Sequence, residues 1–183
     1  TIIANKVVAP KYNDSIVPYI DIDIKGNALY KNRLMMLDII ANNNWKRPVY
    51  FSGGAFDDED YIWMKNYLQL DGMVYKLVPV KTAIPKNGGL LEMGQIDSDK
   101  MYANVMKWDW GNSESTSIYH DPETRKNSIT YRTNLARLME TLLVEGKKEK
   151  AEKACALSID KYCSVAATLR AAGAVITWEV EIL

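Results

Sequence analysis

The stretch LQLDGMVYKLVPV, residues 68–80, decides how the first half of the chain folds. Its Asp71-Gly72 pair is a strong break signal, and residues 73–80 after it have the apolar character of a buried strand. Residues 57–70 begin with four acidic side chains, which complement the positive end of a helix dipole. We therefore expect a helix over 57–70 that stops at Asp71-Gly72 and is followed by a strand.

The segments before this stretch predict a small α/β unit. Strand patterns occupy three segments, residues 2–8, 16–24 and 49–51. Residues 28–41 favour a helix that starts after a cap at Asn27, and the asparagines at 42–44 suit the left-handed conformation that ends helices. The order of these elements over residues 16–80 predicts an α/β fold with a small, mostly parallel sheet and right-handed crossover helices.

The second half of the chain is predicted to be mainly helical. Residues 97–108 favour one helix, and a leucine-rich stripe with a period of 3.6 follows. That stripe consists of Leu135, Leu138, Met139, Leu142 and Leu143. Gly146 separates it from a second apolar stripe between Cys155 and Leu169, which indicates an antiparallel helical hairpin. Residues 176–182 alternate like a final strand, and we expect an α/β domain at 1–94 and a helical region at 95–183.

Composition and charge exclude several classes of protein. The chain has 183 residues, of which 48% are hydrophobic, so it can form a real core. Its 23 basic and 23 acidic residues give no net charge, which argues against nucleic acid or an anionic membrane as a partner. No apolar run has the length of a spanning helix, which predicts a soluble polypeptide. The start at Thr1 suggests that an upstream part is missing, and nothing in the sequence sets the oligomeric state.

The sequence also lacks the usual signatures of catalysis. His120 is the single histidine, whereas zinc sites normally need two or three, and no glycine-rich phosphate loop occurs. Cys155 and Cys163 are eight residues apart within one predicted helix, a spacing of about 12 Å that prevents a disulfide between them. We therefore expect no cofactor and no catalytic residue in this chain.

Aromatic side chains are the best candidates for binding. The chain has eleven Tyr and five Trp but two Phe, a bias that suits sugar stacking or a protein interface. The predicted ligand-binding residues are Trp45, Arg47, Tyr50, Trp108 and Trp110. A simpler interpretation is that Trp45 fastens a helix end to the sheet while Trp108 and Trp110 anchor a long loop.

An alternative hypothesis uses acidic residues. Asp21-Ile22-Asp23 matches the D-x-D pattern that can hold a divalent cation, although alternation in a strand explains it as a solvent face. Ser52-Gly53-Gly54 could receive an anion, but the acidic quartet at 57–60 argues against a phosphate. His120-Asp121 is a weak acid–base pair because no nucleophile signature lies nearby. We assign no metal ligand.

Several motifs resemble those of a known family. The most specific are N-x-W-x-R-P-[IV]-Y-F at 43–51, L-x-x-x-G-x-x-Y-x-L-V-P at 68–79, W-G-N at 110–112, R-x-N-L-A-R-L at 132–138 and G-K-x-x-K-A at 146–151. Over about residues 16–153 the chain resembles the soluble C-terminal portion of the bacterial membrane-protein family catalogued as domain of unknown function 2723. That family is similar to protein O-mannosyltransferases.

This resemblance implies a role class and a location. A multi-pass membrane module would precede the chain and hold any catalytic acid, and the helical hairpin would be tetratricopeptide-like. The domain would face the periplasm at the inner membrane. The leading hypothesis is a non-catalytic accessory domain that contacts glycan, an acceptor protein or its own membrane module. The alternatives are a metal-dependent sugar-processing enzyme that uses Asp21 and Asp23, and a protein-interaction scaffold.

Overall fold

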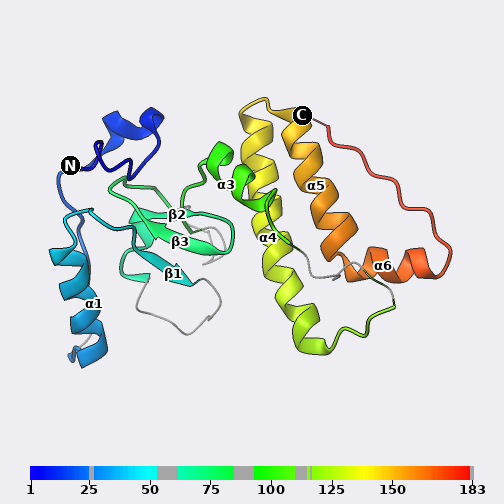
Figure 1. Cartoon of the computed structure of the whole chain (residues 1–183), viewed down its shortest axis with the longest axis horizontal. Helices are drawn as coiled ribbons and strands as arrows, with labels where there is room; N and C mark the ends of the chain where they lie inside the picture. The colour runs from blue at the N-terminus through cyan, green and yellow to red at the C-terminus, as the bar shows by residue number, and fades with distance from the viewer. Residues whose placement is uncertain (25–26, 53–61, 85–92, 110–114, 116, 182–183) are drawn as a thin grey trace. The chain divides into compact units, whose positions relative to one another are not determined.

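The computed structural model of the chain describes residues 1–24, 27–52, 62–84, 93–109, 115 and 117–181 (Figure 1). The chain divides into two compact units, Thr1–Asp97 and Ser98–Leu183. In the described part, none of the helices combines the length and apolar content that crossing a bilayer requires.

The first unit is built around an antiparallel sheet in which β3 (Val74–Leu77) is the central strand. β2 (Leu68–Leu70) pairs with one edge of β3 and β1 (Tyr50–Ser52) with the other, so the order is β1-β3-β2. The expected mostly parallel sheet is therefore wrong. The turn between β2 and β3 contains Gly72 at φ 88°, and the N–H of Asp71 donates to the carbonyl of Val74 at 2.9 Å.

The prediction of a parallel sheet fails at Asp71-Gly72. This pair forms the turn of a β-hairpin, whereas we expected it to end a helix. Ile62 is helical, but a turn follows it, Lys65–Tyr67 is a single 3-10 turn (η2), and the residues after that are β2. The helix predicted over 57–70 is therefore wrong from Trp63 onward. An Asp-Gly pair favours a tight hairpin because glycine tolerates positive φ. The acidic quartet at 57–60 lies outside the described residues.

Two other predicted strands are also absent. Residues 2–6 form turns, and Pro10–Ser15 is a 3-10 helix (η1). Within 16–24, Ile16 makes an isolated bridge to Val80 and the Val17 N–H donates to the carbonyl of Pro79 at 2.9 Å, but no strand forms. Pro10 and Pro18 have no N–H to donate, which limits a continuous ladder here.

The first predicted helix is present as α1 (Lys31–Asn42). It begins later than expected, after Tyr30, which caps it with extended backbone and no side-chain hydrogen bond. Asn44 and Trp45 follow at φ 48° and 57°, so the predicted left-handed asparagine ending is confirmed at Asn44. No described residue of α1 is buried, and the sheet and the loops beside it supply the core of this unit.

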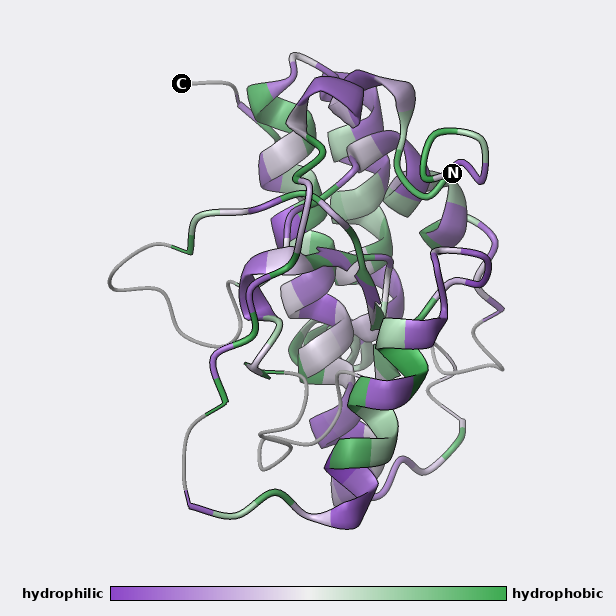
Figure 2. Ribbon diagram, turned by 90° about the vertical axis from the view of Figure 1, so that its left-hand side faces the viewer, coloured by the Kyte–Doolittle hydropathy of each residue, from purple (hydrophilic) through white to green (hydrophobic). Residues whose placement is uncertain are grey.

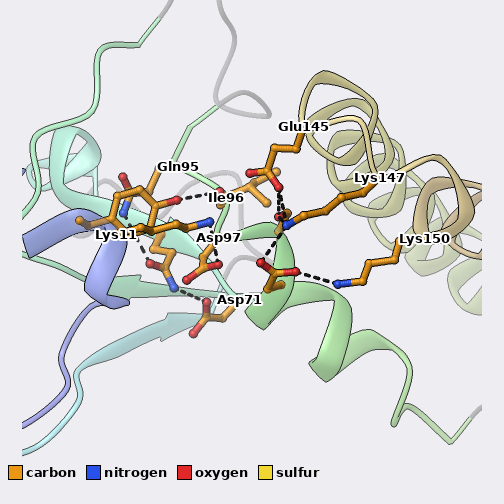
Figure 3. Close-up of polar contacts among 12 residues, drawn as sticks. Lys11, Asp71, Gln95, Ile96, Asp97, Glu145, Lys147 and Lys150 are labelled. Carbon is orange, nitrogen blue, oxygen red and sulfur yellow. Dashed lines mark hydrogen bonds and ion pairs between the residues drawn. The ribbon is translucent and has the colours of Figure 1, made fainter. Parts of the chain in front are cut away.

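That core has an apolar and a polar part. Met64, Leu68, Leu70, Val78 and Met93 are almost fully enclosed. The buried side chain of Gln69 donates to Asp71 at 2.6 Å, and Lys11 pairs with the enclosed carboxylate of Asp97 at 3.3 Å (Figure 3). Each of these polar groups has a partner, as burial requires.

The second unit contains the predicted helical hairpin. α3 (Ser98–Val105) comes first, and α4 (Pro122–Val144) and α5 (Lys148–Tyr162) then pack along each other (Figure 1). Asp121 caps α4 by accepting the N–H of Thr124 at 2.9 Å. The stripe residues Leu135, Leu138 and Leu142 are enclosed, as are Ala151 and Ala154 of α5.

The end of the hairpin differs from the prediction. The second helix breaks at Cys163, whose thiol accepts the N–H of Ala166 at 3.4 Å and caps a separate helix, α6 (Ser164–Ala171). Cys155 and Cys163 are both free thiols, and burial raises the pKa of Cys155. The described residues 174–181 form neither helix nor strand, so the predicted final strand is wrong there. Residues 176–181 alternate in sequence but pair with no described strand.

An ion-pair network joins α3 to the turn between α4 and α5 (Figure 3). Lys147 Nζ lies 2.8 Å from Asp99 and 2.7 Å from Glu145, and Lys150 Nζ lies 2.7 Å from Asp99. The hydroxyl of Ser98, which is fully enclosed, donates to Glu145. Hydrogen bonds from Lys147 and Lys150 lower the pKa of Asp99 to about 2. The network thus ties the first two residues of α3, Ser98 and Asp99, to the turn after α4 and the start of α5.

We expect Leu138→Ala to lower the free energy of unfolding by about 2–5 kcal/mol, because it leaves a cavity between α4 and α5. Val144→Ala on the same helix is the matched control, since Val144 is 89% exposed. Its effect should stay within about 0.5 kcal/mol. Urea unfolding followed by circular dichroism measures both, and equal effects would contradict this packing.

We expect Asp99→Asn to destabilise the chain at pH 7 but not at pH about 2. The folded-state pKa of Asp99 is lowered from 3.8 to about 2, so its contribution is complete above 3.8 and disappears as the pH falls to about 2. The carboxylate is partly exposed, so the effect at pH 7 should be about 0.5 kcal/mol. Thermal unfolding of both proteins at each pH tests this. A difference that persists undiminished in acid would show that the network is not responsible.

Candidate functional site

A cleft in the second unit is the best candidate site among the described residues. It lies between the N-terminal half of α4 and the junction of α5 and α6, and its volume is about 810 Å³. Pockets for small ligands commonly have volumes of about 300–1,000 Å³. Its lining includes Tyr119, Arg125, Asn127, Tyr131, Asp160 and Tyr162.

Stacked aromatic rings form one wall of the cleft. The rings of Tyr131 and Tyr162 are parallel within 10°, with centroids 4.7 Å apart. Trp108 meets Tyr131 edge-on, at 5.6 Å and 89°. Such pairs are rigid and place aromatic surface beside polar atoms. Burial raises the pKa of Tyr162 well above its ordinary value, so its hydroxyl stays protonated at neutral pH.

The start of α4 supplies a second wall. The Arg125 side chain donates from Nε to the carbonyl of His120 at 2.9 Å, and its guanidinium lies 6.0 Å from the centre of the Tyr119 ring. Hydrogen bonds from Thr124 hold the pKa of Asp121 below its usual range, which keeps the helix cap ionised. The capping bonds therefore fix the backbone that carries Tyr119 and Arg125.

The third wall comes from the junction of α5 and α6. Asp160 at the end of α5 forms an ion pair with Arg170 of α6 at 2.6 Å. The Thr168 hydroxyl donates to the carbonyl of Ser164 at 2.8 Å. Because Cys163 ends α5 and caps α6, the chain turns here and the cleft has a boundary on this side.

The predicted binding residues have different environments. Trp108 contacts the aromatic wall through Tyr131, whereas Trp110 lies outside the described residues. Trp45, Arg47 and Tyr50 belong to the first unit. Their role in binding stays a prediction, because the contacts described next are structural.

In the first unit, the Trp45 ring packs against an apolar cluster formed by Val7, Val8, Val78 and Val80. Arg47 is exposed, and its backbone exchanges two hydrogen bonds with the Asn43 side chain, at 2.7 and 3.2 Å. Tyr50 stands on the edge strand β1, which overlaps the strand expected at 49–51, and its side chain is 46% exposed. The local geometry agrees with the simpler interpretation that Trp45 fastens the end of α1.

The metal hypothesis has no assembled ligand set in the part of the chain that the structure describes. Asp21 and Asp23 are exposed and do not lie on a strand, so the alternation that placed them on one face is not realised. No group of three or more His, Cys, Asp or Glu side chains comes together among the described residues.

Ser98 and Lys147 form a pair that resembles a serine–lysine nucleophile and base. Lys147 Nζ lies 3.1 Å from the Ser98 hydroxyl. A lysine base must be neutral, but the hydrogen bonds that Lys147 donates to Asp99 and Glu145 raise the pKa of Lys147. The lysine is therefore charged, and the pair is better explained as part of the structural network.

Sequence reasoning missed the stacked tyrosines as a pair. Tyr162 lies within the apolar stripe between Cys155 and Leu169, and Tyr131 lies four residues before Leu135 on the preceding stripe. Residues equally far from the turn lie opposite each other in an antiparallel helical hairpin. Tyr131 is 15 residues before Gly146 and Tyr162 is 16 after it, so the hairpin register could have placed them together.

Comparison with known proteins gives one family. The family model described as TMEM260-associated domain 2 matches residues 1–100 of the chain, which is more than half of its length. No curated protein and no solved structure matches the chain significantly.

Proposed function

The chain belongs to the TMEM260-associated domain 2 family, and we propose from this membership that it is an extramembrane accessory domain of a larger membrane protein. TMEM260 is an O-mannosyltransferase-like protein, which supports a parent of the glycosyltransferase-like class. The bond-making step would belong to the membrane module of that parent. We assign no catalytic residue to this chain.

The motif resemblance makes the proposal more specific. Two of the motifs that resemble the domain-of-unknown-function 2723 family, at residues 43–51 and 68–79, lie inside the matched residues 1–100. They support a bacterial parent whose accessory domain faces the periplasm. On the same basis, the α4–α5 hairpin would be a tetratricopeptide-like element.

The cleft of the second unit would be the part that contacts a glycan or an acceptor protein. The observation that carries this proposal is the stack of Tyr131 on Tyr162 at the wall of an 810 Å³ cleft, with Trp108 edge-on behind it. Rigid aromatic rings beside hydroxyl and amide groups suit ligands with both apolar faces and polar edges. Trp108 was predicted to contact the ligand directly, but it is not among the described lining residues, and in this proposal it supports the stack instead.

The first unit would contact the parent's own membrane module. Three large apolar side chains of α1, Leu34, Met35 and Ile39, are each more than half exposed, and hydrophobic positions recur along this helix in Figure 2. Exposed apolar groups of this kind favour a protein contact. Arg47 and Tyr50 are exposed in the same unit and could add polar contacts there. This observation also favours the second candidate function, an interaction scaffold.

We expect Ala167→Phe to abolish binding in the cleft, because the ring would occupy space that Ala167 lines. The probe is an array that carries soluble oligosaccharides and Ser/Thr-rich peptides, with the labelled full chain applied to it. The signal of any ligand that binds the cleft should fall about tenfold or more, which corresponds to about 1.4 kcal/mol.

The matched control is Ala103→Phe, the same substitution at an exposed position of α3 outside the cleft lining. It should retain the array signal of the unmodified chain. Thermal unfolding of both variants checks that neither change disrupts the fold. Undiminished binding by Ala167→Phe would show that the cleft is not the binding site.

A further inference from the structure

Among the described residues that line the cleft, the formal charges cancel. The described lining contains two basic residues, Arg125 and Lys161, and two acidic residues, Asp109 and Asp160. Asp160 pairs with Arg170 at 2.6 Å, and Arg125 is held by the His120 carbonyl and the Tyr119 ring. Asp109 and Lys161 each interact with another group as well. A charged ligand would therefore have to compete with contacts that already exist.

Neutral hydrogen-bonding groups make up most of the remaining polar lining. They are Ser115, Ser117, Thr124, Asn127, Ser128, Ser164 and Thr168. Several of these hydroxyls already donate their proton: Thr124 to Asp121 at 3.1 Å, and Ser128 to the Arg125 carbonyl at 2.6 Å. Such an oxygen keeps its lone pairs for accepting, while the exposed amide of Asn127 can both donate and accept.

A ligand that matches this lining must itself donate and accept without carrying charge. Hydroxyl groups do both, and a pyranose ring presents several of them together with an apolar face that can lie on an aromatic ring. A carboxylate or phosphate only accepts, and taking it out of water without a dedicated cation costs several kcal/mol. From these observations, and resting on the proposed function of the cleft, we infer that its ligand is an uncharged saccharide unit.

A Ser/Thr-rich polypeptide is the competing ligand. Its hydroxyls and backbone amides would also donate and accept, but it brings no contiguous set of hydroxyls on a rigid ring. The Tyr131–Tyr162 stack and the balanced charges therefore favour the saccharide. The peptide is one outcome of the test below.

The test compares three ligands that share one ring: a methyl hexoside, the corresponding hexuronate and the hexose 6-phosphate. Each is titrated into the full chain and followed by two-dimensional NMR, with the amide signals of Asn127, Tyr131 and Ser164 as reporters of the cleft. The neutral hexoside should shift these signals. Both charged analogues should bind about tenfold more weakly, because their charge is desolvated without a dedicated partner.

Asp160→Asn tests the charge balance itself. It frees Arg170 from its ion pair and gives the described lining one net positive charge. The hexuronate should therefore gain affinity, and the tenfold difference in affinity between the hexoside and the hexuronate should become smaller. Arg170→Gln removes the ion-pair partner of Asp160, so the unneutralised Asp160 carboxylate should weaken binding of the hexuronate further. Glu152→Gln on the same helix as Asp160 removes an acidic residue outside the lining and should leave the difference in affinity unchanged.

The outcomes separate this inference from the proposed function. If a charged analogue binds as tightly as the hexoside, or if the reporters respond to a Ser/Thr-rich peptide and to none of the sugars, the inference is overturned while the cleft remains a binding site. If neither the sugars nor the peptide move the reporters, the inference and the proposed role of the cleft both fail. The inference is supported if the hexoside binds more tightly than the hexuronate and if Asp160→Asn makes this difference in affinity smaller.

Discussion

The packing of α4 against α5 is the interaction on which the candidate site depends. Enclosed leucines of α4 face two enclosed alanines of α5, and small residues allow the helices to approach closely. The short turn at Gly146 sets the register, which places Tyr131 beside Tyr162. α4 has 23 residues and α5 has 15, so α4 is longer by about 12 Å. The first turns of α4 therefore extend beyond the end of α5, and these turns line the cleft.

The fold was predictable where a helical pattern of apolar residues continues over many residues, and not where the apolar run is short. The stripe from Leu135 to Leu142 repeats over several turns, which a strand cannot imitate, and the hairpin follows from it. β2 has three residues, and Leu68, Gln69 and Leu70 are all buried. A run of three residues is too short for its period to distinguish a strand from a helix, so the segment before Asp71-Gly72 could be taken for the end of a helix. Once that element was misassigned, the crossover topology and the parallel sheet followed from it.

The candidate site was predictable only in part, because its chemistry is long-range. A rule that selects aromatic residues beside polar ones found Trp108, which contacts the site, and also Trp45, whose ring packs on a valine cluster. Local sequence does not say which way a ring points. The tyrosine stack joins residues 31 positions apart, and it becomes visible only when the hairpin register is applied to the sequence. The helix break at Cys163 forms the third wall of the cleft, and no proline or glycine at this position predicts it from the sequence.

The two units carry different kinds of evidence about function. The family match ends at residue 100, three residues after the boundary of the first unit, whereas all described residues of the cleft lie in the second unit. Membership in a family that is associated with a membrane protein therefore rests mainly on the first unit, and the proposed ligand contact rests on the second. This division suits an accessory domain in which one part is held by the parent protein and the other meets the ligand. It also means that the ligand has to be argued from the charges, hydroxyls and rings of this chain, because the family match does not extend to them.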